Sequence, residues 1–163
     1  MPTRADDVPG GRSGWRPIQR QVIVTRPFDD VWPVMAARPA GVLGARPAGD
    51  DGPGLEVRVR RLGGDAERTV LLHLGGFVQL GDRAVLPLSW ADFGQEDVFP
   101  VLNAVLELGS GDDPATTRVV LVGRYRPPLG AVGRTVDCPG GAEVVAESVT
   151  TFLTDLAGRL ESA

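Results

Sequence analysis

The strongest constraint on the fold is an apolar pattern of helical period near the end of the chain. Apolar residues recur there at steps of three and four, which places them on one side of an α-helix, opposite acidic and polar residues. About 20 residues at about 1.5 Å each give a helix of roughly 30 Å, long enough to cross a whole sheet. The break at Pro139, Gly140 and Gly141 predicts that the helix begins beyond it. Its buried side is predicted to consist of Val145, Val149, Phe152, Leu156 and Leu160.

Alternating apolar and polar residues predict a series of β-strands before this helix. The glycine pair Gly75–Gly76 is expected to bend one of them or to mark a bulge, and Pro87 indicates an edge strand or an irregular ladder position. The stretch GSGDDPAT has the composition of a hairpin turn. The predicted strands cover residues 18–25, 55–61, 68–80, 84–90, 99–108 and 117–125.

A short helix is predicted after the first strand. Pro27 is well placed to open it, and Val31, Trp32 and Met35 are expected on its buried side, although Pro33 removes one helical hydrogen bond. Residues 38–54 then carry glycines and prolines at short intervals and are predicted to form a long connection, with Val42 and Leu43 as its apolar anchor. The element order is therefore strand, helix, several strands and a long helix.

This order predicts an α+β domain with an antiparallel sheet, because strands joined by short turns are antiparallel neighbours. No helices separate the later strands, as a parallel nucleotide-binding sheet would require. The chain has 163 residues, which suits one domain, and we assign it to residues 18–163. Residues 1–17 are rich in Gly, Pro, Arg and Asp without an apolar period, and are expected to form a flexible leader.

Composition narrows the possible partners and the compartment. A net charge of −4 and the lack of a concentrated basic face argue against nucleic acid. No apolar tract is long enough to cross a bilayer, so stable membrane insertion is not expected. The single cysteine cannot form an internal disulfide and the first residues lack the apolar core of a secretion signal, so we expect a cytoplasmic protein.

Several strings resemble the SRPBCC superfamily, also called START-like or helix-grip proteins, and especially its small uncharacterised actinobacterial members. Together with the first strand they cover nearly all of residues 18–163, and YRPPLG within the third is the most distinctive. The glycine-rich break before the last helix and Pro33 in the first depart from the family pattern. The strings are VTRPFDDVW at 24–32, RAVLPLSW at 83–90, VFPVLNAVLEL at 98–108, TRVVLVGRYRPPLG at 117–130 and FLTDLAGRL at 152–160.

The resemblance implies a helix-grip fold, in which a curved antiparallel sheet wraps around the long C-terminal helix and leaves a hydrophobic cavity. Members of the superfamily bind lipids, sterols, quinones or plant hormones, act as polyketide aromatases and cyclases, or serve as co-chaperones. Shared architecture does not choose among these functions, because function depends on the site.

Residue types that usually carry catalysis or metal binding are sparse. His73, the only histidine, falls on the polar side of its strand, and no second ligand or catalytic partner converges on it. Cys138 sits in a proline-glycine turn and is interpreted as a plain thiol, and Asp112 and Asp113 as turn residues rather than calcium ligands. No nucleophile, zinc or phosphate-loop motif is present, so we predict neither a cofactor nor a metal.

The candidate ligand-binding positions are the apolar residues assigned to the concave face of the sheet and the facing side of the last helix. The alternative for each is an ordinary place in a filled core. Tyr125 stands out, since a buried hydroxyl needs a partner and could orient a ligand carbonyl or bond the backbone. The candidates are Leu86, Leu88, Trp90, Leu102, Leu106, Val119, Leu121, Tyr125, Val149 and Phe152.

The leading hypothesis is a carrier or sensor of a small hydrophobic, lipid-like or polyketide-like molecule. The alternative is a polyketide cyclase, aromatase or dehydratase using the same pocket, with Tyr125 as its proton donor. A protein-binding module is a third hypothesis and would need an exposed apolar patch outside the pocket. The sequence does not define the oligomeric state.

Overall fold

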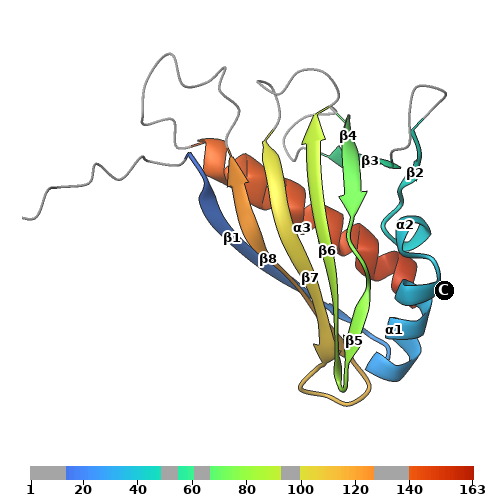
Figure 1. Ribbon diagram of the computed structural model, residues 1–163. Coiled ribbons are helices and arrows are strands. Elements are labelled where there is room, and N and C mark those ends of the chain that lie inside the picture. Colours follow the sequence, from blue (N-terminus) through green and yellow to red (C-terminus); the bar gives the residue numbers. More distant parts are fainter. Residues whose placement is uncertain (1–13, 49–54, 61–66, 93–99, 127–139) are drawn as a thin grey trace, which may run out of the picture.

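The computed structural model describes residues 14–48, 55–60, 67–92, 100–126 and 140–163. These residues form one antiparallel sheet with a long helix across it and two short helices at one end (Figure 1). In chain order the elements are β1 (Arg16–Val24), α1 (Phe28–Ala37), α2 (Pro39–Val42), β2 (Arg46–Pro47), β3 (Leu55–Arg60), β4 (Glu67–Leu74), β5 (Val78–Leu80), β6 (Arg83–Asp92), β7 (Val101–Ser110), β8 (Thr117–Arg126) and α3 (Gly140–Glu161).

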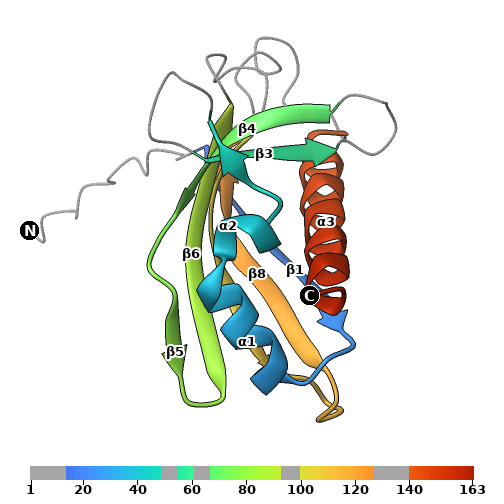
Figure 2. The ribbon, with the colours of Figure 1, turned by 90° about the vertical axis from the view of Figure 1, so that its right-hand side faces the viewer.

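The sheet joins the first strand to the last. Its order is β1-β8-β7-β6-β4-β3-β2, and β5 also pairs with β6. All of these pairs are antiparallel, which confirms the fold class expected from the short connections. The sheet curves around α3 (Figure 2), as the helix-grip resemblance implied.

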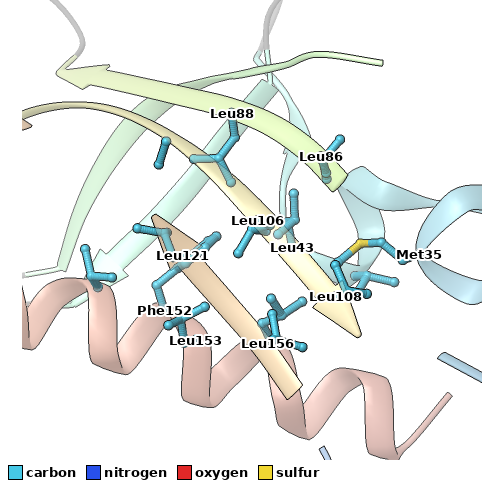
Figure 3. Close-up of a cluster of buried hydrophobic side chains, with 14 of the residues drawn as sticks. Met35, Leu43, Leu86, Leu88, Leu106, Leu108, Leu121, Phe152, Leu153 and Leu156 are labelled. Atoms are coloured by element: carbon cyan, nitrogen blue, oxygen red, sulfur yellow. The ribbon is translucent and has the colours of Figure 1, made fainter. Parts of the chain in front are cut away.

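The backbone of α3 lies close to β1 on one side and β3 on the other, and less close to the middle strands β6, β7 and β8. Side chains therefore fill the space between the helix and the middle of the sheet. Figure 3 shows leucines of β6, β7 and β8 meeting Phe152, Leu153 and Leu156 of α3. We call the side of the sheet that faces α3 the inner face, and the opposite side the outer face.

The predicted alternation holds along the central strands. In β7, Leu102, Ala104, Leu106 and Leu108 are buried, and the residues between them are exposed or half-buried. In β4, Val70 and Leu72 are likewise buried. Because side chains of a strand point alternately to its two faces, each strand contributes one apolar row to the core.

Several boundaries differ from the sequence-based expectation. The first strand begins at Arg16 rather than at residue 18, and Trp15 lies under the guanidinium groups of Arg124 and Arg126 at 5.3 and 5.8 Å from its ring centroid. These contacts and the pairing with β8 extend the strand into the segment assigned to the leader. Residues 1–13 lie outside the described part.

The region 38–54 was predicted to be a plain connection, and this is wrong for its first half. It contains α2 and the two-residue strand β2, and Val42 and Leu43 are buried as expected. In α1 the buried residues are Phe28, Val31 and Met35, whereas Trp32 is only half-buried. Phe28 was missed because it stands at the first helical position, where the helical period gives no prior repeat.

The helix α3 begins at Gly140, before the predicted start. Gly140 and Gly141 belong to its first turn, so the glycine pair does not end the preceding connection as expected. A glycine costs a helix about 0.5–1 kcal/mol relative to alanine, which packing elsewhere along 22 residues can offset. The buried positions Val145, Val149, Phe152, Leu156 and Leu160 are confirmed, and Leu153 and Ala157 join them.

The break between β4 and β5 coincides with Pro87. The N–H of Gly75 donates to the carbonyl of Pro87 at 2.7 Å, and a Cβ added at Gly75 would lie 2.8 Å from the proline ring. In an antiparallel strand, the carbonyl and the nitrogen of one residue point toward the same neighbouring strand. The Pro87 nitrogen, which carries no hydrogen, therefore faces the place where β4 has ended and β5 has not yet begun. This confirms the irregular ladder position that was predicted.

The C-terminal end of α3 is tied to the segment between β1 and α1. The Glu161 carboxylate accepts hydrogen bonds from the N–H and the hydroxyl of Thr25, both at 2.7 Å. Arg26 donates to the carbonyls of Leu160 at 2.7 Å and Ala163 at 3.0 Å. Its own carbonyl accepts from the hydroxyl of Thr117 at 2.8 Å. The end of the helix is thus fixed to β1 and β8 by polar contacts as well as by apolar packing.

Candidate functional site

The ten candidate positions all lie in the interior between the sheet and α3. Trp90, Leu102 and Tyr125 form one row across β6, β7 and β8, because Leu102 is opposite both of the others. A second row lies nearer the β5–β6 and β7–β8 turns and consists of Leu86, Leu106 and Leu121. The structure therefore brings the predicted residues together, and each is at most 4% exposed.

The second row is a packed core. Leu86, Leu106 and Leu121 have no exposed surface, and Figure 3 shows Leu121 beside Phe152 of α3 and Leu86 on the side of Met35 and Leu43. Zero exposure means that no water-sized space adjoins these residues, so their role here is packing. The same holds for Leu102, Val119 and Val149. Four candidates keep a little accessible surface, namely Leu88, Trp90, Tyr125 and Phe152.

Leu88 also lines an open groove. The groove has a volume of about 370 Å³ and is lined as well by the outer-face residues Val105, Val122 and Arg124 and by the small residues Ala104 and Gly123. Ala104 and Gly123 were not singled out in advance. The signal was present in the sequence, because each is the small residue in an inward-facing row that is otherwise large and apolar. Among the candidates, the inner site thus narrows to Trp90, Tyr125 and Phe152.

Trp90 and Phe152 connect the sheet to the helix. Their ring centroids are 5.3 Å apart and the ring planes make an angle of 78°, an edge-to-face arrangement. Such a pair contributes about 0.5–1.5 kcal/mol beyond its buried area. The contact spans the region where the backbone of α3 stands away from β6, and it fixes the position of the indole.

The indole N–H of Trp90 is buried and has no hydrogen-bond partner among the described residues. Trp90 as a whole is only 1% exposed and its ring nitrogen is buried, so bulk water does not reach the N–H group. An indole nitrogen is a donor only, and leaving such a donor unpaired in the interior costs about 1–3 kcal/mol. A buried polar atom of this kind calls for an explanation, and a ligand atom is one of the few that would satisfy it.

Tyr125 is the second polar group of the row. It is 4% exposed, and no hydrogen bond joins its hydroxyl to any other residue in the described part of the chain. Two strand spacings separate it from Trp90, which places the two Cα atoms about 10 Å apart. The inner face therefore presents two hydrogen-bonding side chains on either side of Leu102.

The surroundings of these two groups are uncharged. Among the described residues, the only buried polar or charged ones are Thr117 and Ser148. Thr117 is bonded to the Arg26 carbonyl at 2.8 Å, and Ser148 lies on the inner side of α3. Tyr125 is thus the only titratable side chain buried within the described ranges.

The remaining sequence candidates lie elsewhere. His73 is exposed and pairs with Ser89. The Asp113 carboxylate accepts from the N–H of Ala115 at 2.8 Å, which confirms its predicted role in the turn. Cys138 falls outside the described residues. Within the described ranges, no three metal-ligating side chains cluster and no helix is long and apolar enough to span a bilayer.

Solved structures of other proteins share this architecture. Ara h 8.0201 matches with a TM-score of 0.55 at 9% identity, over 91% of this chain and 99% of that one. The Zhui aromatase/cyclase from Streptomyces sp. R1128 has a TM-score of 0.53 at 18% identity, over 90% and 94%. Protein Ms6760 from Mycobacterium smegmatis has a TM-score of 0.52 at 14% identity, over 90% and 88%.

These likenesses span nearly the whole chain and establish that its fold is the helix-grip fold. No known protein-family model matches the sequence, and no curated protein matches it. At such low sequence identities the likeness defines the fold alone. The function has to be inferred from the residues of the site.

Proposed function

We propose that this helix-grip protein binds a small hydrophobic molecule between the inner face of the sheet and α3, as a carrier or a sensor. The observation that carries the proposal is the buried Trp90 N–H without a partner, in an interior where no charged residue is buried within the described ranges. Folded proteins pair nearly all such donors, so a donor left over beside an aromatic contact favours a molecule that completes it.

The arrangement of α3 supports this function. Its backbone is close to β1 and β3, and only side chains bridge it to β6. Rotation of Phe152 away from Trp90 would open space without breaking any backbone hydrogen bond of the sheet. Ligand sites of this type are mostly apolar with a few well-placed polar groups, as here with Trp90 and Tyr125.

The test is to purify the protein gently from its host and to examine it by native mass spectrometry, followed by thermal denaturation with a panel of lipids and polyketides. A ligand at 100 times its Kd stabilises the folded state by about 2.7 kcal/mol. For a chain of this size that raises Tm by roughly 5–10 °C. Protein that carries no molecule and shows no shift with any member of the panel would contradict the proposal.

A polyketide cyclase, aromatase or dehydratase is the second candidate function. The Zhui aromatase/cyclase shares the fold, and Tyr125 offers a buried hydroxyl that could donate a proton to a substrate oxygen. Enzymes of this kind would act mainly by holding a reactive chain in position. Replacing Tyr125 by Phe should then reduce turnover while leaving the unfolding midpoint nearly unchanged, and unaltered turnover would remove Tyr125 from the mechanism.

A further inference from the structure

We infer that the ligand is a neutral, ring-containing molecule with a carbonyl-type oxygen, which accepts a hydrogen bond from the indole N–H of Trp90. The inference rests on the proposed function and specifies its ligand class. It separates oxygenated ring compounds from fatty acids and from plain hydrocarbons, all of which an apolar interior would otherwise admit.

The oxygen follows from the hydrogen-bonding capacity of tryptophan. The Trp90 nitrogen donates one hydrogen bond and accepts none, and no described residue accepts from it. Since the described residues leave this donor unpaired, an acceptor on the ligand would complete it. A hydrocarbon would leave the donor buried and unpaired, and sites with an unpaired buried group discriminate strongly against an analogue that lacks the matching atom.

The neutral charge follows from the composition of the interior. No charged residue is buried in the described part of the chain, where only Thr117 and Ser148 add to the polar groups already named. A carboxylate or phosphate placed beside Trp90 would lose its hydration without gaining a counter-charge, which is strongly unfavourable. This argues against fatty acids bound with their charged end in this row.

The ring follows from the side chains around the donor. Phe152 meets Trp90 edge to face at 5.3 Å, so a flat apolar body can replace or extend an aromatic contact that is already formed. Tyr125 stands two strand spacings from Trp90 along the row, which corresponds to about 10 Å between the Cα atoms. A second oxygen on the far side of a fused ring system would meet its hydroxyl.

Two matched pairs of probes test the inference. The first pair is 1-tetralone and tetralin, and the second is 9-fluorenone and fluorene; within each pair the molecules differ only by the carbonyl oxygen. Binding to the wild-type protein is measured by calorimetric titration. We expect each ketone to bind at least tenfold more tightly than its hydrocarbon, and we expect Trp90→Phe to reduce that ratio to below threefold.

A spectroscopic measurement makes the test independent of the variant's stability. In an amide and indole NMR spectrum of the ¹⁵N-labelled wild type, the Trp90 N–H signal is assigned by its loss in Trp90→Phe. Trp15→Phe, which alters a tryptophan stacked under Arg124, is the matched control and should retain both the ketone preference and the shift. The ketones should move the Trp90 signal downfield, and the hydrocarbons should not.

The outcomes distinguish the inference from the proposed function. If ketones and hydrocarbons bind equally well and the Trp90 signal does not respond to the oxygen, the ligand class is wrong while hydrophobic binding stands. Preferential binding of the C10 fatty acid decanoate over the ketones would likewise overturn the neutral class. If none of the probes binds and the panel described above also gives no shift, the proposed function itself fails.

Discussion

Phe152 of α3 meets Trp90 of β6 edge to face, and this contact is the main aromatic link between the long helix and the middle of the sheet. Both side chains are almost fully buried. The contact joins α3 to β6, whose backbone is less close to the helix than those of β1 and β3. It therefore supports the fold and also borders the proposed ligand site.

Truncating this link should destabilise the protein strongly. Phe152→Ala removes a buried ring and leaves a cavity, so we expect the free energy of unfolding to fall by about 3–5 kcal/mol. Urea denaturation followed by circular dichroism measures this change. Thr154→Ala, on the exposed side of the same helix, is the control and should change stability by about 0.5 kcal/mol or less. Equal effects of the two substitutions would show that Phe152 is not part of a packed core.

The bonds from Thr25 to Glu161 predict a dependence of stability on pH. The N–H and hydroxyl of Thr25 stabilise the charged carboxylate and hold the pKa of Glu161 below its ordinary value of 4.5. The folded state therefore gains stability from this group above the unfolded pKa and loses it as the pH falls through the folded pKa. Because the group is exposed, the effect is small.

Glu161→Gln tests this dependence. The variant should lose about 0.5–1 kcal/mol at pH 7, since a charged acceptor is replaced by a neutral one at an exposed site. Its stability should also fall less steeply than that of the wild type as the pH drops below 4.5. Thermal unfolding from pH 7 to pH 3 provides the measurement. Parallel curves for the two proteins would refute the role of the Thr25 bonds.

Gly123 should not tolerate a side chain. A Cβ added there would overlap the carbonyl of Asn103 and lie 2.6 Å from the methyl group of Ala104 on the neighbouring strand. Gly123→Ala must push β7 and β8 apart, and we expect a loss of about 1–3 kcal/mol. The matched control is Gly158→Ala in α3, where an added Cβ meets no atom of the described residues within 4 Å apart from the helix's own neighbouring backbone. It should gain about 0.5–1 kcal/mol, because alanine favours the helix over glycine.

The β7–β8 turn depends on one of its two aspartates. Asp113 accepts from the N–H of Ala115 at 2.8 Å, whereas Asp112 is exposed and forms no hydrogen bond with the described residues. Asp113→Ala should lower the free energy of unfolding by about 0.5–1.5 kcal/mol, the net value of a hydrogen bond. Asp112→Ala should have no measurable effect. The reverse order of the two effects in chemical denaturation would contradict the turn geometry.

Local pattern in the sequence was enough to predict the strands, the amphipathic side of α3 and the antiparallel class of the sheet. Alternation in β7 and helical spacing from Val145 to Leu160 are properties of neighbouring residues, and burial of one apolar side enforces them wherever the segment packs. The break at Gly75 and Gly76 was predictable for the same reason, since glycine weakens a strand regardless of its partner.

Tertiary structure alone decided the rest. That β1 pairs with β8, and that Trp90, Leu102 and Tyr125 form one row, depends on register between segments far apart in the chain. Whether a buried leucine packs tightly or borders a site, and whether the Trp90 N–H finds an acceptor, depends on atoms that only folding brings near. Sequence periodicity assigns a side chain to a face, but hydrogen bonding and packing are properties of the groups that meet there.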